Sequence, residues 1–399
     1  MHAAKAAENS LVICYPLVVV SKMDIPFNKL SLVGEERKYL ARAITEGHLS
    51  GDNAFTRRCH KWFETKMGCP SALLTTSCTH ALDMSAMLAC INPGDEVIMP
   101  SYAFTSTANA FVLRGAKIVF IDIRPDTMNI DERLIEGALT RKTKAVVALH
   151  YAGVPCEMDV ICSLSSRRGF RVIEDAAQAL LSRYKGRFAG TIGHFGAFSF
   201  HETKNITCGE GGALLVNDAD CYPRAEILRE KGTDRSRFFR GEIDKYSWVD
   251  IGSSFLPGEL NAAFLYAQLM KAEKINARRT AIWNLYRGLL EPLAAEGLVE
   301  LPCIPPDCEH NGHIFYIKAR DGRERTAIIR HLADKGIMAV PHYVPLHSSA
   351  AGRRFGRLCG RDRFTTSESE RLLRLPLYYS LSARDVRRIA GEIFKFYWK

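Results

Sequence analysis

Hydrophobic residues recur along the chain in two patterns, one typical of amphipathic helices and one typical of buried strands. Phe55, Cys59, Phe63 and Met67 share one helical face, which predicts a helix over this segment. A second helix is expected to begin after residues 77–79 and to end before the Pro93-Gly94 pair.

Six short apolar runs, rich in β-branched residues, predict strands. They cover residues 96–99, 117–121, 144–149, 170–173, 196–200 and 213–216. Helical or glycine-bearing connections separate them, and their nearly continuous apolar character indicates strands that are buried on both faces. We therefore expect an α/β domain with a large, mostly parallel sheet covered by helices.

The pattern changes after residue 265, where long amphipathic segments replace the short apolar runs. The elements expected there are a helix over 272–290, a strand over 314–318, a helix over 325–335 ended by Gly336, a strand over 337–340 and a last helix capped by Ser382. The sequence thus predicts a large α/β domain over residues 23–265 and a smaller α+β domain over residues 266–399.

The first 22 residues are expected to be an extension that is not part of the native fold. Residues 11–20 are apolar and follow a single lysine, but no small-residue cleavage site of a signal peptide comes after them. The run is also shorter than the about 20 residues that span a bilayer. We take Met23 as the start of the patterned sequence and predict no membrane insertion.

Composition narrows the class of protein. Hydrophobic residues make up 47% and charged residues 25% of the chain, which excludes a disordered or collagen-like protein. The net charge of +10 favours an anionic partner. Because the positive charge is spread along the chain without a basic tail, a phosphorylated metabolite accounts for it as well as nucleic acid does, and we predict no nucleic-acid binding.

The 12 cysteines form no C-x-x-C pair, so neither a zinc site nor a disulfide framework is expected. Free thiols fit a cytoplasmic protein. No metal site is predicted.

Three polar segments stand where ligands of α/β folds bind. Asp175 follows the strand predicted at 170–173, at the sheet edge formed by strand ends. Lys204 stands between a strand end and the glycine-rich segment 209–212, where desolvation would lower its pKa and make its amine a nucleophile. Residues 76–79 open a helix, whose free N–H groups attract a phosphate.

Each of these segments also has a purely structural explanation, as a helix cap or as a solvated lysine. In this order within one α/β domain, however, they supply what is needed to hold pyridoxal phosphate.

The same segments resemble motifs of the sugar aminotransferases that use pyridoxal phosphate and have the aspartate aminotransferase fold (fold type I). The family's E-D-A-A-Q stands at 174–178, its S-F-x-x-x-K at 199–204 and its G-E-G-G at 209–212. The resemblance implies that Lys204 carries the cofactor as a Schiff base and that Asp175 pairs with the pyridine nitrogen. It also assigns cofactor contacts to the following residues: Gln178 at the phenolic oxygen, Cys78, Thr79 and Ser199 at the phosphate, and Phe104 on the ring.

Further segments, at 229–254 and 340–347, resemble the branch of the family that makes dTDP-4-amino-4,6-dideoxygalactose for enterobacterial surface glycans. This similarity implies a dTDP-linked 4-keto-6-deoxy sugar as acceptor, L-glutamate as donor and a homodimer with shared active sites. The residues that it places at the substrate are His201, Arg240, Tyr343 and His347.

Two positions depart from the family's pattern. Cys78 replaces a glycine, so a left-handed backbone at this position would be strained. Ser254 replaces an asparagine that reaches the cofactor or substrate of the neighbouring subunit, so that contact is expected to be weaker or made by other groups.

Other functions remain open at this level. The related sugar dehydratases have histidine in place of the lysine, so Lys204 argues against them. An aminotransferase that acts on a different nucleotide-linked keto sugar, or a relative that binds the cofactor without turnover, fits the same motifs. Neither the base of the nucleotide nor the configuration of the new amine follows from the sequence.

Overall fold

A computed structural model describes residues 23–398 of the chain. The expected extension, residues 1–22, lies outside the described residues. None of the helices within 23–398 is long and apolar enough to cross a membrane.

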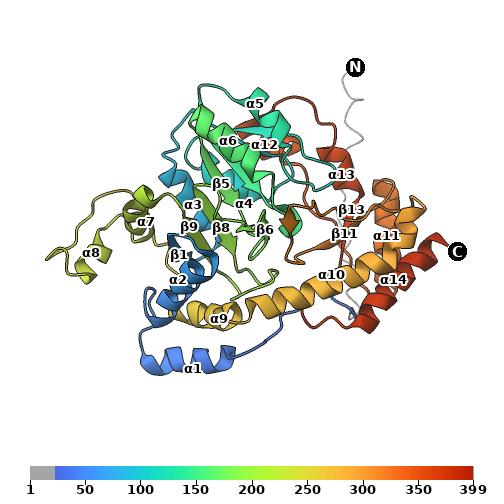
Figure 1. The fold of residues 1–399 in the computed structure, drawn as a ribbon, viewed down its shortest axis with the longest axis horizontal. Coiled ribbons are helices and arrows are strands. Elements are labelled where there is room, and N and C mark those ends of the chain that lie inside the picture. The colour runs from blue at the N-terminus through green and yellow to red at the C-terminus, as the bar shows by residue number, and fades with distance from the viewer. Residues whose placement is uncertain (1–22, 399) are drawn as a thin grey trace, which may run out of the picture.

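An eight-stranded sheet forms the centre of the molecule (Figure 1). Its strands are β1 (Ser71–Thr75), β2 (Glu96–Pro100), β3 (Lys117–Ile121), β4 (Thr143–Leu149), β5 (Arg171–Asp175), β8 (Phe195–Ser199), β9 (Gly212–Val216) and β12 (Gly356–Leu358). They lie in the order β1-β9-β8-β5-β4-β2-β3-β12. Only β9 runs antiparallel to its neighbours, so the predicted mostly parallel sheet is confirmed.

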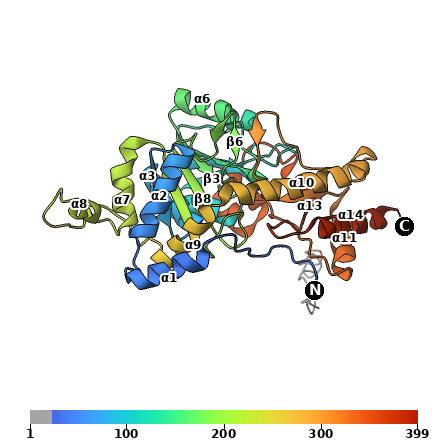
Figure 2. The same cartoon turned by 60° about the horizontal axis from the view of Figure 1, so that its bottom comes forward.

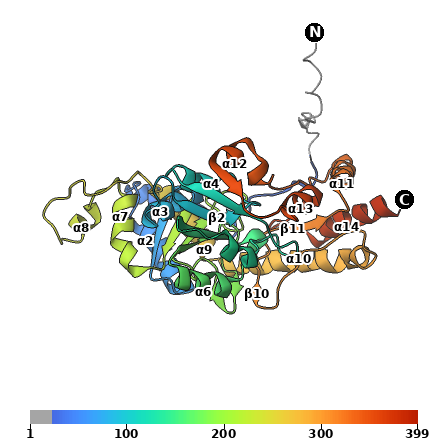
Figure 3. The same ribbon diagram turned by 90° about the horizontal axis from the view of Figure 1, so that it is seen from above.

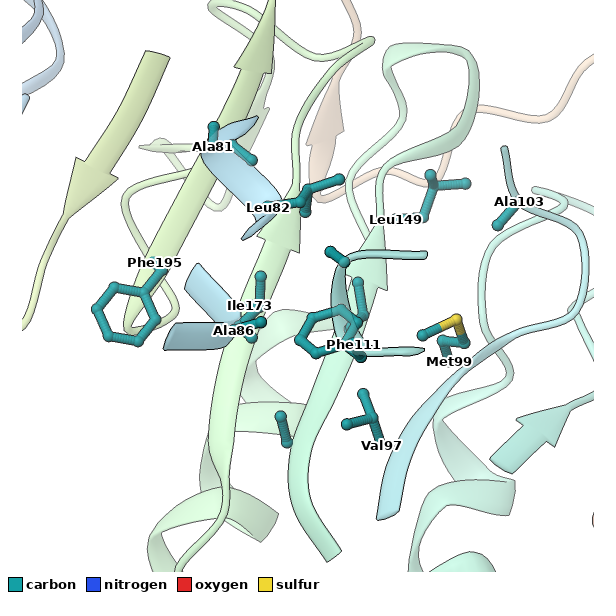
Figure 4. Close-up of a cluster of buried hydrophobic side chains, with 14 of the residues drawn as sticks. Ala81, Leu82, Ala86, Val97, Met99, Ala103, Phe111, Leu149, Ile173 and Phe195 are labelled. Atoms are coloured by element: carbon teal, nitrogen blue, oxygen red, sulfur yellow. The ribbon is translucent and has the colours of Figure 1, made fainter. Parts of the chain in front are cut away.

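Helices cover both faces of this sheet. They are α2 (Ala54–Met67), α3 (Cys78–Leu88), α4 (Thr105–Val112), α5 (Ile135–Ala138), α6 (Met158–Arg168), α7 (Tyr222–Arg229) and α9 (Glu259–Leu269). The helix α1 (Glu36–Glu46) packs on α9, and α8 (Arg235–Phe239) projects from the body (Figure 1). On one face, side chains of α3 and α4 pack on the strands in a core that includes Leu82, Phe111 and Ile173 (Figure 4). The helix predicted from Phe55 to Met67 buries the expected face.

The segments after residue 271 form a second cluster, which we call the C-terminal unit. It contains α10 (Ala272–Ala295), β11 (Phe315–Lys318), α11 (Gly322–Asp334), β13 (Leu372–Leu375) and α14 (Ala383–Tyr397), which share one core. The helices α12 (Ala350–Phe355) and α13 (Thr365–Arg371) connect it with the large sheet, to which β12 belongs. The three short strands β6 (Arg183–Tyr184), β7 (Arg187–Phe188) and β10 (Cys308–Glu309) form a separate sheet. The domain boundary at residue 265 stays a prediction.

One expected strand, at residues 337–340, does not form. The partner of β11 is β13 instead. Ile337 and Val340 make single bridges, to Ile25 and Arg374, and Pro341 directly after them has no N–H with which a ladder could continue.

Two buried residues, Glu174 and Gly212, position the strands that carry the site. The carboxylate of Glu174 accepts N–H bonds from Gly190, Ile192 and Gly193 at 2.6–2.7 Å. It also contacts Nε2 of His150 at 2.9 Å, and both side chains are fully buried. Because Cys156 N–H donates to Nδ1 of His150, the imidazole donates to Glu174 through Nε2.

Gly212 lies directly against the turn that precedes α3. A Cβ at this position would lie 2.3 Å from the carbonyl carbon of Ser77 and 2.5 Å from the nitrogen of Cys78. Both atoms belong to the backbone, so they cannot move aside by a change of rotamer. The close approach of β9 to the start of α3 therefore requires glycine.

We predict that Gly212→Ala lowers the free energy of unfolding by about 1–3 kcal/mol, the range typical of overpacked sites, and weakens cofactor retention. Urea unfolding and the ratio of cofactor to protein after dialysis measure the two effects. The matched control is Gly137→Ala in α5, where an added Cβ meets nothing within 4 Å. Equal stability of Gly212→Ala and wild type would show that the turn has room for a side chain.

Candidate active site

A cavity of about 710 Å³ opens at the carboxyl ends of β5 and β8, between the large sheet and the C-terminal unit. Nine of the residues predicted for the site line it: Cys78, Thr79, Phe104, Asp175, Gln178, Ser199, His201, Lys204 and Tyr343. Segments far apart in the sequence thus meet in one place.

The start of α3 forms one end of this cavity. Ser77 is the N-cap of the helix, and its hydroxyl accepts from the N–H of His80 at 3.2 Å. The hydroxyl of Thr79 bonds that of Ser106 at 2.9 Å. Free N–H groups and hydroxyls of this kind are the donors that hold a phosphate at a helix N-terminus.

Cys78 fits this turn without the strain that its replacement of glycine led us to expect. It is the first residue of α3, and its φ is not positive. Burial raises the pKa of its thiol well above the usual range, so it lines the cavity as a neutral group.

Asp175 lies at the end of β5 and is 3% exposed. Its carboxylate accepts from the hydroxyl of Thr107 at 2.6 Å and from the N–H of Ala177 at 3.2 Å. Burial raises the pKa of this carboxyl, against the opposing effect of these bonds. A cation placed beside it, such as a protonated ring nitrogen, would keep it ionised.

Lys204 follows β8 and reaches the same cavity. Solvent reaches part of its side chain, but enough protein surrounds the amine for desolvation to lower its pKa. The charge of Arg374 acts in the same direction, whereas Asp175 opposes it. A larger fraction of neutral amine follows, and a neutral amine is the form that acts as nucleophile or base.

Gln178 is held on both ends of its amide. Its oxygen accepts from the N–H of Ala152 at 2.7 Å, and its nitrogen donates to the hydroxyl of Tyr343 at 2.9 Å. The ring of Tyr343 stacks on that of His342, with centroids 3.6 Å apart. Nδ1 of His342 lies 2.8 Å from the hydroxyl of Tyr151, and burial lowers the pKa of His342 well below the usual range.

Three predicted residues do not line this cavity. His347 lies 2.6 Å from the hydroxyl of Ser101 and 3.2 Å from Asp362, which are contacts that hold the loop after Pro345. Arg240 pairs with Glu226 and Glu242. Ser254 is exposed and makes a backbone bridge to Glu230.

Arg240 and Ser254 belong to a projecting segment, residues 230–254, which we call the α8 arm. It extends from the body at the end opposite α14 in all three views (Figures 1, 2 and 3). The tip of the arm around α8 therefore lies away from the cavity (Figure 1), whereas its base adjoins the start of α3, where the N–H of Thr76 donates to the oxygen of Phe255 at 2.9 Å.

The structure adds site residues that the sequence analysis did not single out: Phe27, Asn28, Ser106, Thr107, Arg279, His313 and Arg374. Ser106 and Thr107 follow Phe104 in the first turn of α4, where polar residues are free to face a ligand. Arg279 and Arg374 carry no local motif, because packing of the C-terminal unit alone brings them here.

The residues present fit pyridoxal phosphate. The cavity offers an amine, a buried carboxylate, a helix N-terminus with hydroxyls and the aromatic ring of Phe104, which is 54% exposed. These groups match the aldehyde, the ring nitrogen, the phosphate and the flat ring of the cofactor.

Comparisons with known proteins lead to the same assignment. The sequence profile of the DegT/DnrJ/EryC1/StrS aminotransferase family matches residues 31–394. The uncharacterized protein MJ1066 of Methanocaldococcus jannaschii is 35% identical over 347 residues, which cover 85% of this chain and 89% of that protein.

Solved structures share the fold over nearly the whole chain. DesV from S. venezuelae, in complex with a ketimine intermediate, is 29% identical with a TM-score of 0.85, and the match covers 94% of this chain and 99% of that chain. Spr1654 from Streptococcus pneumoniae in its PMP form is 25% identical with a TM-score of 0.84 over 94% and 99% of the two chains. Its PLP form has a TM-score of 0.83 at 25% identity over 93% and 98%.

The fold is that of the type I, aspartate aminotransferase-like enzymes, and pyridoxal phosphate is the cofactor. The chain belongs to the DegT/DnrJ/EryC1/StrS family and is a sugar aminotransferase.

Proposed function

We propose that the protein transfers the amino group of L-glutamate to C4 of dTDP-4-keto-6-deoxy-D-glucose and so forms dTDP-4-amino-4,6-dideoxy-D-galactose for bacterial surface-glycan synthesis. The observation that carries the chemistry is the meeting of Lys204 and Asp175 in one desolvated cavity. The similarity of segments 229–254 and 340–347 to one branch of the family supports the choice of sugar.

Five residues are proposed to hold the cofactor. Thr79 and Ser199, with the start of α3, bind the phosphate, and Phe104 covers the ring. Gln178 contacts the phenolic oxygen, and Asp175 pairs with the ring nitrogen. When bound, pyridoxal phosphate supplies the aldehyde that accepts the amino group and a ring that takes up the electron pair released at the donor's Cα.

Lys204 is proposed to move the proton. Burial lowers its pKa and so favours the neutral amine, which would carry a proton from the Cα of the donor to C4′ of the cofactor and, in the second half-reaction, from C4′ to C4 of the acceptor. Thr107 keeps one oxygen of Asp175 fixed at 2.6 Å, which preserves the direction of the carboxylate toward the ring nitrogen. His201 and Tyr343 line the cavity and are proposed to contact the sugar.

Arg240 and Ser254 are proposed to act across a homodimer. The α8 arm exposes Phe239, Tyr246 and Trp248, the last to 80%, and its arginines suit the diphosphate of a nucleotide. An arm that leaves its own cavity can complete the cavity of a second subunit. His347 is proposed to act on the sugar indirectly, because its contacts hold the loop after Pro345.

The overall proposal is tested by incubating the protein with L-glutamate and dTDP-4-keto-6-deoxyglucose. We expect 2-oxoglutarate and a 4-amino sugar whose NMR couplings show an axial amine at C4. A uridine-linked sugar serves as the comparison for the base. Formation of no amino sugar from either nucleotide would contradict the proposed acceptor.

We predict that Lys204→Ala lowers turnover by at least about 10³-fold, since the site then lacks its proton-transfer group. The variant should also lose the borohydride-reducible bond to the cofactor, which mass spectrometry of the reduced protein detects. Lys144→Ala, at an exposed lysine near the start of β4, is the matched control. Normal turnover together with a reducible bond in Lys204→Ala would assign the role to another amine.

We predict that Asp175→Asn folds normally and lowers kcat by about 10²–10³-fold, because a neutral amide does not keep the ring nitrogen protonated. The pKa of Asp175 is raised by burial, so its ionised form costs stability in the cofactor-free protein as the pH rises through that pKa. The cofactor-free variant should therefore be at least as stable as wild type at pH 8, but gain less in Tm from cofactor. Asp334→Asn, at an exposed site, is the control. Near-normal kcat would leave Asp175 with a structural role only.

We predict that mixed dimers restore activity if the α8 arm completes the neighbouring site. Lys204→Ala subunits are combined with subunits that carry a disabling Ser254→Trp substitution, and activity is measured before and after subunit exchange. One intact site per heterodimer should recover about a quarter to a half of wild-type activity, as expected for isologous pairing. Verified heterodimers without any recovery would place the whole site within one chain.

A further inference from the structure

Two arginines border the cavity without an acidic partner. Arg279 in α10 is 3% exposed and Arg374 in β13 is half-buried, and both line the cavity with Lys204. In the part of the chain that the structure describes, neither forms an ion pair.

The hydrogen bonds of their guanidinium groups go only to backbone carbonyls, and Arg374 also lies over the ring of Phe27, 4.7 Å from its centroid. Arg279 donates from Nε to the oxygen of Gly312 at 3.1 Å and from Nη2 to that of His313 at 2.8 Å. Arg374 donates from Nε and Nη2 to the oxygen of Pro341 at 3.2 and 2.9 Å. Carbonyl dipoles offset only part of the cost of burying a cation, and arginine is rarely buried without an anion.

Burial desolvates both guanidinium groups. Burial lowers the pKa of Arg279 to about 9 and lowers that of Arg374 as well. His313 lies beside them, but burial lowers its pKa well below the usual range, so it adds no charge. The surroundings thus lack an anion on the side of the cavity formed by the C-terminal unit.

The acids of the cavity do not supply that anion. Asp175 is bound to Thr107 and Ala177 and faces the place of the ring nitrogen. Glu210 is exposed and lies 3.7 Å from His201. The missing charge must therefore come from a ligand.

The position and geometry of the arginines identify the class of ligand. Arg279, Arg374 and Lys204 line one cavity, so an anion bound by these arginines shares that cavity with the reacting amine. In a nucleotide sugar the diphosphate is attached at C1, across the ring from the reacting C4. Its phosphates therefore lie farther from the reacting amine than a small donor does. A small carboxylate fits this place, and the guanidinium plane binds carboxylates through two parallel hydrogen bonds.

We propose that Arg279 and Arg374 together form a dicarboxylate site that binds the two carboxylates of the amino donor. The assignment rests on the proposed function, and it selects acidic amino acids such as glutamate over monocarboxylic ones. The small donor is thereby recognised by the C-terminal unit, while the large sheet holds the cofactor.

Calorimetric binding of glutarate to the holoenzyme tests this site without turnover, because glutarate has both carboxylates and no amine. Arg374→Gln and Arg279→Gln should each weaken glutarate binding at least tenfold. The matched control is Arg287→Gln, which removes another α10 arginine that donates to a carbonyl, that of Pro302, outside the cavity. If a glutamine variant fails to fold, Arg374→Lys and Arg279→Lys, which keep the charge, should still weaken glutarate binding at least about threefold, because lysine cannot form the two parallel hydrogen bonds.

Separated half-reactions give the second readout. Both glutamine variants should raise the KM for L-glutamate at least tenfold. L-2-aminobutyrate has only the α-carboxylate, so its KM should change little in the variant that lacks the arginine for the second carboxylate. The sugar half-reaction should keep its KM for the nucleotide sugar. Thermal unfolding checks that each variant is folded.

The outcomes separate this inference from the proposed function. Wild-type glutarate binding and wild-type KM for glutamate in both variants would overturn the dicarboxylate site while the transaminase assignment stands. Loss of dTDP affinity with unchanged glutarate affinity would also overturn it, because the arginines would then serve the diphosphate. A wild-type protein that produces no 2-oxoglutarate from glutamate would contradict the proposed function instead.

Discussion

The buried carboxylate of Glu174 is the contact on which the arrangement of the site depends. Three backbone N–H groups of residues 190–193 and the imidazole of His150 converge on it. A buried charge persists only where hydrogen bonds satisfy it, so these four donors fix the distance between β5 and the loop that enters β8. Asp175 ends β5 and Lys204 follows β8. The contacts of Glu174, the residue directly before Asp175, therefore help to set the separation of these two reactive groups.

Much of the fold could be predicted because buried strands leave a strong local pattern. The six predicted strands of the sheet correspond to strands in the structure, with ends that differ by at most two residues. The strand predicted at 337–340 was wrong because an apolar run does not reveal which partner it will meet, and β13 had taken the place beside β11. β1 was missed because the apolar residues of Ser71–Thr75 are alanine and leucine, which favour helices over strands.

The site was predictable where its residues stand in motifs at strand ends. Asp175, Gln178, Ser199 and Lys204 come together because parallel strands place their carboxyl ends at one edge. Arg279 and Arg374 could not be found in this way, since their meeting depends on how the C-terminal unit packs on the sheet. Arg240 and Ser254 lie on the α8 arm, whose surroundings a single chain does not define.

The cavity takes its walls from two cores, one centred on the large sheet, to which Tyr316 of β11 and Leu372 of β13 also belong, and one within the C-terminal unit. A substitution in the second core can reshape the wall that carries β13 without moving the strand ends that carry Asp175 and Lys204. Selection can thus alter which compounds are accepted while the reactive groups stay in register. In such an architecture, substitutions in the C-terminal unit can change the substrate while the strand ends that carry the reactive groups keep their positions.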